Sequence, residues 1–277
     1  MPLSPSETIR LLDSINHRPK KKLGQNFLID GNIVLKSLNM ASLDRDTQVV
    51  EIGPGLGTLT KQLLSKVHTV HAVEIDTCLF SNLQSEFADS ISNKKLSLIN
   101  EDAVKYPIGN LPSTVKDFAV VANLPYAISS PWMEAILNTS RIPKCMVLML
   151  QKETADRMNG KHGTKYYNAL NIFLRSCFKQ IKTHPVPRQC FHPAPGIDSV
   201  LVRMDRLENP FLFNKDVRVL IRKIFTQRRK QIGAIAKNEA SSVRNKILNW
   251  LDIVNLSTKL RPEEIEPLAL KKLAEEY

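Results

Sequence analysis

The stretch from Val49 to Thr60 constrains the fold of this chain more than any other. Its first four residues form an apolar run broken only by Glu51, three alternating glycines follow, and an amphipathic segment begins at Thr58. A β-strand that ends in glycines and leads into a helix brings backbone N–H groups and the positive helix end against a ligand. The stretch therefore predicts a strand, a loop and a helix that together form a small-molecule site.

The spacing of these glycines separates two classes of ligand. Dinucleotide-binding loops follow the pattern G-x-G-x-x-G. Here Thr58 stands at the last required position, and the third glycine comes one residue early, at Gly57. The pattern that is present, E-x-G-x-G-x-G from Glu51, is typical of methyltransferases that bind a nucleoside joined to an amino acid. A tight turn without a ligand is the alternative for an isolated loop of this kind.

Three later strands end in polar residues that suit such a ligand. We predict these strands at 68–76, 96–100 and 118–122. Glu74 follows Gly53 by 21 residues, where nucleotide-binding α/β proteins place an acid on the ribose hydroxyls. Asp102 can accept a hydrogen bond from an adenine amino group, and Asn123 follows the fourth strand. Because a doubly wound sheet binds its ligand at the carboxyl ends of its strands, we expect all four residues at one edge.

The remaining predicted elements complete an α/β architecture. Helices are expected at 5–16, 131–138 and 168–178, a buried strand at 144–150, and an edge strand at 199–204. A change in composition near Asn209 and Pro210 indicates a linker to a smaller second unit. A chain of 277 residues is long enough to contain both.

Residues 23–28, Leu-Gly-Gln-Asn-Phe-Leu, place a polar pair just before a helical pattern. Gln25 and Asn26 would cap that helix in one interpretation. In the other, the segment is a lid whose Asn26 and Phe27 cover a ligand at the glycine loop. The sequence leaves both interpretations open.

Several features exclude other classes of protein. The longest apolar run, 145–150, is too short to span a bilayer, so we expect no membrane association. The first 18 residues lack an apolar signal core, and the four cysteines form no C-x-x-C pair, which fits a reducing cytoplasm. His68 and His71 have no third ligand nearby, so no metal site is expected.

The tetrapeptide Asn123-Leu124-Pro125-Tyr126 is the most specific chemical signal. Patterns of this kind follow the fourth strand in enzymes that methylate an exocyclic amino group of a nucleobase. The Asn123 side-chain oxygen and the Leu124 carbonyl would accept the two amine hydrogens, while Pro125 fixes the backbone. Tyr126 would stack on the base. The alternative is an ordinary turn at the end of a strand.

A second aromatic residue, Phe191, begins the proline-rich loop 191–199. It would cover the opposite face of the same base, or else it is a buried core residue. A base inside a duplex is out of reach, so the substrate base must be flipped out or lie in a loop.

Positive charge is concentrated near the end of the chain. The formal net charge is +12 and the isoelectric point is about 9.6. Ten Lys or Arg residues stand against two acids between Lys215 and Lys246, which places a net +8 there. Apolar residues repeat at helical spacing from Val217, and we expect Arg218, Arg222 and Arg229 on the opposite face. The segment predicts a nucleic-acid contact surface rather than charge for solubility alone.

In this order, these motifs resemble one family, the ribosomal RNA adenine dimethylases, and within it the branch that acts on the small subunit. The resemblance covers nearly the whole chain through the glycine loop and residues 22–28, 73–76, 101–103, 123–126, 167–170, 191–195, 227–230 and 260–264. It implies a Rossmann-like class I S-adenosylmethionine-dependent methyltransferase domain with a small α-helical C-terminal domain. The implied domains are a basic extension at 1–22, a catalytic domain at 23–207 and a helical rRNA-binding domain at 208–277.

The resemblance also implies an activity and a set of site residues. Four methyl groups would pass from S-adenosyl-L-methionine to two adjacent adenosines in the 3′-terminal hairpin loop of 16S-type rRNA. The enzyme would act as a cytoplasmic monomer on a 30S assembly intermediate. The implied cofactor residues are Gln25, Asn26, Leu28, Gly53, Gly55, Glu74, Ile75, Asp102, Ala103 and Asn123. Asn123, Leu124, Tyr126 and Phe191 would be catalytic, and Arg222, Arg228, Arg229 and Lys230 would bind RNA.

Two other functions compete with this one. Relatives that methylate a single large-subunit adenine and confer macrolide resistance share the catalytic core. A non-catalytic assembly or transcription factor could keep the fold and the basic surface. Such a protein could lose Glu74, Asp102 or Asn123, and their presence favours an enzyme. Gly196 departs from the family, which usually carries a basic or polar residue there.

Overall fold

A computed structural model of the chain describes residues 4–276. The chain divides into two compact units, which are described separately. Unit 1 contains the chain up to Ala155 together with Lys179–Arg206, and unit 2 contains Asp156–Phe178 and the chain from Leu207. Within residues 4–276, no helix is long and apolar enough to cross a membrane.

Unit 1 is built on a seven-stranded sheet with the order β4-β3-β2-β5-β6-β9-β7. The neighbours from β4 to β6 pair in parallel, and β9 runs antiparallel to β6. The strands are β2 (Gln48–Ile52), β3 (Thr69–Val73), β4 (Leu96–Ile99), β5 (Phe118–Asn123), β6 (Cys145–Gln151), β7 (Phe178–Val186) and β9 (Ser199–Arg206). The chain order reverses between β2 and β5, the place where doubly wound sheets bind ligands. The predicted α/β fold is confirmed.

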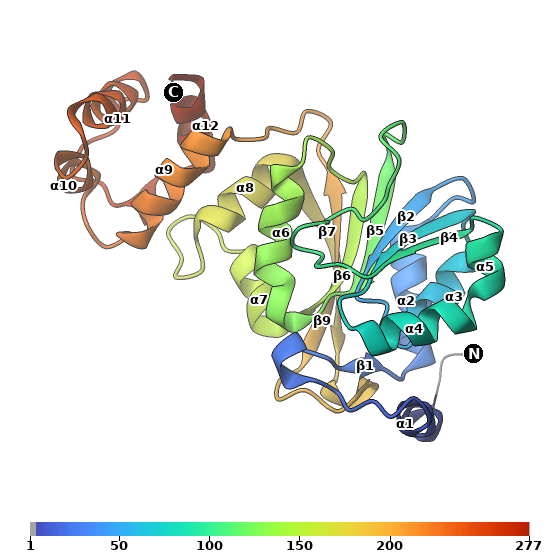
Figure 1. Cartoon of the computed structure of the whole chain (residues 1–277). Helices are drawn as coiled ribbons and strands as arrows, with labels where there is room; N and C mark the ends of the chain where they lie inside the picture. The colour runs from blue at the N-terminus through green and yellow to red at the C-terminus, as the bar shows by residue number, and fades with distance from the viewer. Residues whose placement is uncertain (1–3, 277) are drawn as a thin grey trace. The chain divides into compact units, whose positions relative to one another are not determined.

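Helices cover both faces of this sheet. They are α2 (Gly31–Ala41), α3 (Thr58–Leu64), α4 (Thr77–Glu86), α5 (Ala88–Ser92) and α6 (Ser129–Asn138), with short 3-10 turns η1 (Lys21–Leu23), η2 (Tyr126–Ile128) and η3 (Arg188–Cys190). In Figure 1, α2 to α5 lie on one side of the sheet and α6 on the other. One core cluster joins α2 and α3 to the alternate side chains of β2, β3, β5 and β6. The near-continuous burial of β2 and β5 follows from this double cover.

Two outer strands differ from the sequence prediction. Residues 199–204 were expected at an edge, but β9 lies between β6 and β7. The strand at that edge is β7, which was not predicted. It is exposed at most positions and carries lysines and Pro185, so it has no alternating apolar pattern. Lysine and proline are common on edge strands because they discourage pairing with another chain.

The predicted N-terminal extension is packed onto unit 1. Its helix α1 (Pro5–Ser14) contributes Leu12 to a small apolar cluster with Phe27, Leu56 and Leu79. Residues 1–3 of that extension lie outside the described residues. Farther along, β1 (Phe27–Leu28) pairs with β8 (Phe191–His192), which sets Leu28 opposite Phe191.

Unit 2 is helical. It contains α8 (Ala169–Cys177), α9 (Lys215–Thr226), α10 (Ile232–Lys237), α11 (Ser241–Ile253), η4 (Pro262–Glu264) and α12 (Pro267–Glu276), and α7 (Lys152–Met158) crosses its boundary. The predicted C-terminal domain, 208–277, does not include Asp156–Phe178, which belongs to unit 2 in the structure. This segment packs with the later helices because Tyr167 is fully buried, donates to the Ile265 carbonyl at 2.9 Å and meets the Phe225 ring edge-on at 5.3 Å.

Candidate active site

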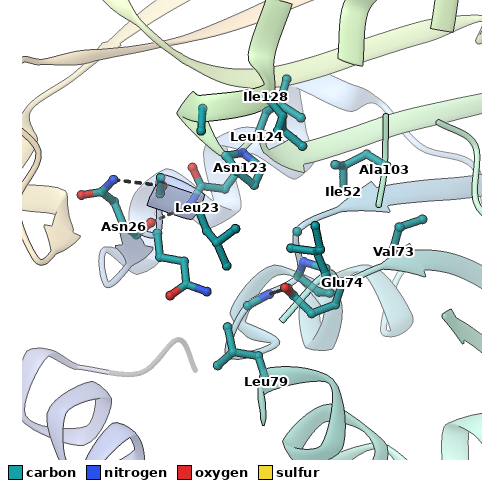
Figure 2. A pocket seen from close by; sticks show the side chains of 18 of the residues that line it. Leu23, Asn26, Ile52, Val73, Glu74, Leu79, Ala103, Asn123, Leu124 and Ile128 are labelled. Atoms are coloured by element: carbon teal, nitrogen blue, oxygen red, sulfur yellow. Dashed lines mark hydrogen bonds between the residues drawn. The ribbon is translucent and has the colours of Figure 1, made fainter. Parts of the chain in front are cut away.

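A pocket opens where the carboxyl ends of β2 to β5 meet (Figure 2). Its empty volume is about 1010 Å³, part of it open to solvent, which is the size of a ligand site. The four expected residues at the strand ends, Gly53, Glu74, Asp102 and Asn123, all line it. In Figure 2, Asn26 lies on one side of the cavity, and Glu74 and Ala103 lie on the other.

The three glycines of the loop are required by its backbone conformation and by its close packing. Gly53, Gly55 and Gly57 have φ angles of 66°, 59° and 77°, which L side chains rarely adopt. A Cβ on Gly53 would lie 2.7 Å from Pro125 Cγ, and one on Gly55 would lie 3.2 Å from the Phe27 ring. The loop is therefore packed against both the Asn123–Tyr126 motif and the segment that precedes α2.

Glu74 presents a buried carboxyl group to the pocket. Its residue is 4% exposed, its Oε2 accepts from the Gly55 N–H at 3.0 Å, and its Oε1 accepts from the Asp76 N–H at 2.9 Å. Burial raises the pKa of Glu74, and these two backbone hydrogen bonds act in the opposite direction. A carboxylate held in this way has oxygen lone pairs left for the two hydroxyls of a ribose.

The next strand end places a hydrogen-bond acceptor beside apolar side chains. Asp102 Oδ1 accepts from the Val104 N–H at 2.8 Å, which holds the carboxylate in place, and Asp102 lines the pocket. Ile75 and Ala103 line it as well; Ile75 is 49% exposed, so an apolar surface lies open beside a hydrogen-bond acceptor. This combination suits an adenine ring and its amino group.

The segment before α2 lines the pocket rather than capping the helix. The N-cap of α2 is Asp30, whose side chain accepts from the Asn32 and Ile33 N–H groups. The capping interpretation of Gln25 and Asn26 is therefore wrong. All residues from Lys22 to Leu28 line the pocket, including the expected Gln25, Asn26 and Leu28.

Asn123 points to the pocket and is oriented by a long-range hydrogen bond. Its Nδ2 donates to the Asn26 carbonyl at 3.1 Å, and the residue is half-buried among the pocket-lining residues. Leu124 is fully buried, and both it and Tyr126 line the pocket. The Tyr126 hydroxyl lies 2.5 Å from Ser199 Oγ, and burial raises the pKa of this phenol. Tyr126 therefore stays neutral.

Phe191 is not brought to the pocket with the other predicted catalytic residues. It is 3% exposed and belongs to the core cluster under α2, as the core alternative predicted. Its ring meets Tyr126 edge-on, with 6.5 Å between centroids and 68° between planes. The two rings do not form parallel faces around a base here, so a stacking role for Phe191 stays a prediction.

Glu51 is a pocket residue that sequence reasoning missed. It lies on β2 two residues before Gly53, is 1% exposed and lines the pocket. Within the described residues, neither its Oε2 nor the nearby Thr60 Oγ1 has a hydrogen-bond partner. Burial raises the pKa of Glu51 to about 8; the nearby Thr60 hydroxyl acts in the opposite direction, and the Glu74 carboxyl adds to the rise. The signal was its place as the first letter of E-x-G-x-G-x-G.

The basic segment of unit 2 is less available than its sequence suggested. Arg218 was expected on the exposed face of α9 but is 9% exposed, because residues 156–178 cover part of that face within unit 2. Arg222 is half-buried over the Phe173 ring at 5.6 Å.

The three basic residues after α9 differ from one another. Arg228 donates to the Lys165 carbonyl at 2.7 Å and pairs with Glu263 at 3.1 Å. Arg229 and Lys230 are exposed. Arg229 and Lys230 are therefore accessible to solvent, whereas Arg228 makes its contacts within unit 2.

The residues of the pocket fit S-adenosylmethionine. Its ribose suits the Glu74 carboxyl group, its adenine suits the Asp102 carboxylate beside Ile75 and Ala103, and Gly53 and Gly55 line the same pocket. Together with the sheet order, this defines an S-adenosylmethionine-dependent methyltransferase of the Rossmann-like class I fold.

Comparison with known proteins gives the family. The profile of the ribosomal RNA adenine dimethylase family matches residues 16–269, and the chain belongs to this family. It is 44% identical over 266 residues to a ribosomal RNA small subunit methyltransferase A of Opitutus terrae, covering 96% of this chain and 95% of that one. The corresponding protein of Staphylococcus haemolyticus is 34% identical over 99% of this chain and 95% of its own length.

Solved structures agree. A dimethyladenosine transferase from Plasmodium falciparum is 28% identical, with a TM-score of 0.70 over 89% of this chain and 95% of that chain. The 23S rRNA methyltransferase ErmE has a TM-score of 0.64 at 24% identity, over 91% of this chain and 99% of that chain, and shows the fold alone.

Proposed function

We propose that this protein transfers four methyl groups from S-adenosylmethionine to N6 of two adjacent adenosines in the 3′-terminal hairpin loop of small-subunit rRNA. The observation that carries the proposal is the position of Asn123 on the same pocket as Glu74 and Gly53. Because the Asn123 Nδ2 already donates to the Asn26 carbonyl, its Oδ1 is the amide atom left for an incoming amine. Because this oxygen only accepts hydrogen bonds, it favours a substrate group that carries N–H donors, such as the adenine amine.

The chain's own residues then supply alignment rather than base catalysis. The Asn123 Oδ1 and the Leu124 carbonyl would accept the two N6 hydrogens and turn the nitrogen lone pair toward the donor side of the pocket. Tyr126 would support the base, and stacking of this kind contributes about 1–3 kcal/mol per base. When bound, the cofactor would supply an electrophilic methyl group from its sulfonium. Because N6 gains a positive charge as it takes the methyl group, it can release a proton after transfer without a base from the protein. Holding the reactants in line accounts for most of the acceleration.

The partner and location follow from this substrate. We propose that the enzyme acts as a monomer in the cytoplasm on a 30S assembly intermediate, in which the hairpin loop is still accessible. The two relatives described above are methyltransferases of small-subunit ribosomal RNA, which supports a substrate in the 30S particle. The exposed Arg229 and Lys230 in unit 2 supply charge for phosphate contacts.

The test is methylation of defined particles. Purified protein with S-adenosylmethionine should make N6,N6-dimethyladenosine on 30S subunits from cells that lack this modification, detected by nucleoside mass spectrometry and as a primer-extension stop in the terminal hairpin. Mature, already dimethylated 30S subunits are the control and should stay unchanged. Methylation of 50S subunits alone would assign the protein to the large-subunit branch, and no methylation of either would favour a binding factor.

A further inference from the structure

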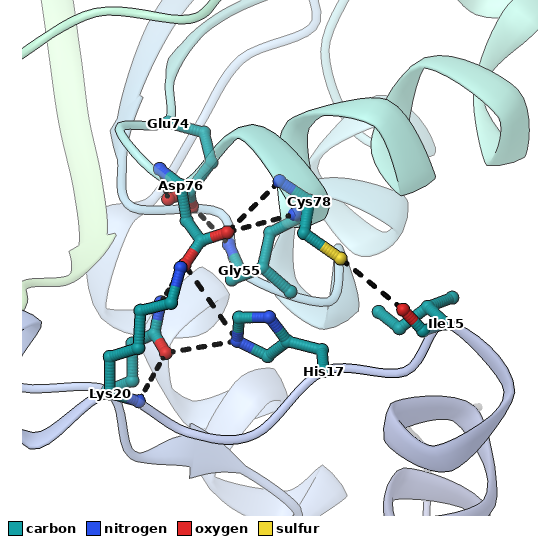
Figure 3. Close-up of polar contacts among 9 residues, drawn as sticks. Ile15, His17, Lys20, Gly55, Glu74, Asp76 and Cys78 are labelled. Carbon is teal, nitrogen blue, oxygen red and sulfur yellow. Dashed lines mark hydrogen bonds and ion pairs between the residues drawn. The ribbon is translucent and has the colours of Figure 1, made fainter.

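The buried carboxylate of Asp76 ties the N-terminal segment to the cofactor pocket (Figure 3). Its residue is 2% exposed, and its Oδ2 accepts from Lys20 Nζ at 2.8 Å and from Gln25 Nε2 at 3.1 Å. Its Oδ1 caps α4 by accepting from the Cys78 and Leu79 N–H groups. One carboxylate thus joins the start of α4 to a segment about fifty residues earlier in the chain.

The N-terminal segment is held at further points around this carboxylate. Gln25 Oε1 accepts from the Lys20 N–H at 2.8 Å and lies 3.1 Å from His17 Nε2. Cys78 Sγ donates to the Ile15 carbonyl at 3.4 Å. His17 is 6% exposed, and these contacts hold the segment from residue 15 to residue 25 against the start of α4.

This network continues into the site on both sides. The Asp76 N–H donates to Glu74 Oε1, the carboxyl group assigned to the ribose. On the other side, Gln25 is followed by Asn26, whose carbonyl accepts from Asn123 Nδ2. The carbonyl that orients the Asn123 amide therefore belongs to the segment that Asp76 holds.

The electrostatics favour an ionised Asp76. Burial alone would raise its pKa, but hydrogen bonds from Lys20, Gln25 and the Leu79 N–H outweigh burial and lower the pKa. A buried carboxylate that loses one of its charged donors is left uncompensated, which is costly. Removal of the Lys20 ammonium group is therefore the single change in the segment that should disturb this carboxylate most.

We propose that Asp76 and Lys20 are positioning residues that hold the 17–26 segment over the S-adenosylmethionine pocket and thereby set both cofactor affinity and the orientation of Asn123. Neither residue touches a reacting atom. The proposal rests on the proposed function, since it names that pocket's ligand. Lys20 acts through Asp76, whereas its neighbour Lys21 is exposed and lies outside the network.

The experiment compares Lys20→Met with the matched control Lys21→Met in the full-length protein. Binding of S-adenosylhomocysteine is measured calorimetrically without RNA, so that loss of a phosphate contact cannot contribute. We expect Lys20→Met to weaken binding by roughly five- to tenfold and Lys21→Met by less than about twofold. Lys20→Arg should restore most of the affinity. In methylation assays, Lys20→Met should also raise the KM for S-adenosylmethionine by a similar factor.

A double-mutant cycle tests the link between the two residues. Asp76→Asn keeps an N-cap side chain for α4, so the protein should fold. If Lys20 acts through Asp76, Lys20→Met should cause no further loss in the Asp76→Asn background. Equal affinities of Lys20→Met and Lys21→Met, or additive losses in the cycle, would overturn the proposal while leaving the proposed function intact. A wild-type protein that binds no S-adenosylhomocysteine would instead overturn the proposed function.

Discussion

Pro125 occupies the space that a side chain on Gly53 would need, because a Cβ built on Gly53 would lie 2.7 Å from Pro125 Cγ. Gly53 and Pro125 are 72 residues apart in the chain, and the glycine loop and the Asn123–Tyr126 motif therefore depend on each other's shape. The cofactor half and the substrate half of the site meet at this contact.

Gly53→Ala should disable the cofactor site. The new methyl group would press on the Pro125 ring, and the φ of 66° at this position is strained for alanine by about 1–3 kcal/mol. We expect S-adenosylhomocysteine binding, measured by calorimetry, to weaken at least about tenfold. Gly196→Ala is the control, because a Cβ there meets nothing within 4 Å. Unchanged affinity in Gly53→Ala would mean that the loop and motif can move apart freely.

Asn123→Ala should abolish methylation while leaving rRNA binding nearly unchanged. The variant removes the side-chain oxygen that accepts from N6, and loss of one such preorganised contact reduces kcat by roughly a hundredfold or more. Single-turnover rates on 30S subunits check the chemistry, and filter binding checks the affinity. Asn110→Ala, an exposed asparagine, serves as the control. Wild-type rates would remove Asn123 from the mechanism.

The basic residues after α9 should divide into two groups. Replacing Arg229 and Lys230 with Ala should weaken 30S binding and reduce the slope of log Kd against log salt by roughly one to two. Arg228→Ala should instead lower the free energy of unfolding by about 1–2 kcal/mol, because Arg228 pairs with Glu263 and the Lys165 carbonyl. Denaturant unfolding distinguishes the two. A stable Arg228→Ala protein with a flattened salt slope would return Arg228 to the RNA surface.

The sequence predicted the position of the pocket because the residues that mark it are recognisable from their local sequence. Gly53, Glu74, Asp102 and Asn123 each stand at the end of a buried strand, and parallel pairing brings such ends together without further information. The edge strand β7 was missed because its side chains are largely exposed and polar, so burial leaves no pattern in the sequence.

Long-range contacts are the features that local sequence spacing does not predict. Arg218 and Arg228 look alike in a basic stretch, and only the packing of residues 156–178 shows that one is buried and the other is paired. The hydrogen bonds of Asp76 to Lys20 and Gln25 are likewise invisible in local spacing. The sequence left two alternatives open for Phe191, because the nearby prolines do not indicate whether its ring faces the pocket or the core.

Glu51→Gln should change how stability depends on pH. Burial raises the pKa of Glu51 from an ordinary 4.5 to about 8 in the folded protein. Between these values the folded state holds a proton that the unfolded state has lost, so stability is fully present below about pH 4.5 and is lost as pH rises toward 8. The slope from this one group is at most about 1.4 kcal/mol per pH unit. Glutamine does not titrate, so the Glu51→Gln variant lacks this pH-dependent part of the free energy of unfolding.

The measurement is denaturant unfolding of cofactor-free protein at several pH values from 5 to 8.5, a range set by the pKa of about 8. Relative to wild type, Glu51→Gln should gain stability steadily as pH rises, whereas the exposed Glu208→Gln should run parallel to wild type. A Glu51→Gln curve parallel to wild type would show that Glu51 is ionised in the folded state. In that case Glu51 would be a buried carboxylate that lines the cofactor pocket. Its Oε2, which has no hydrogen-bond partner among the described residues, would then need a hydrogen-bond donor or a positive charge beside it.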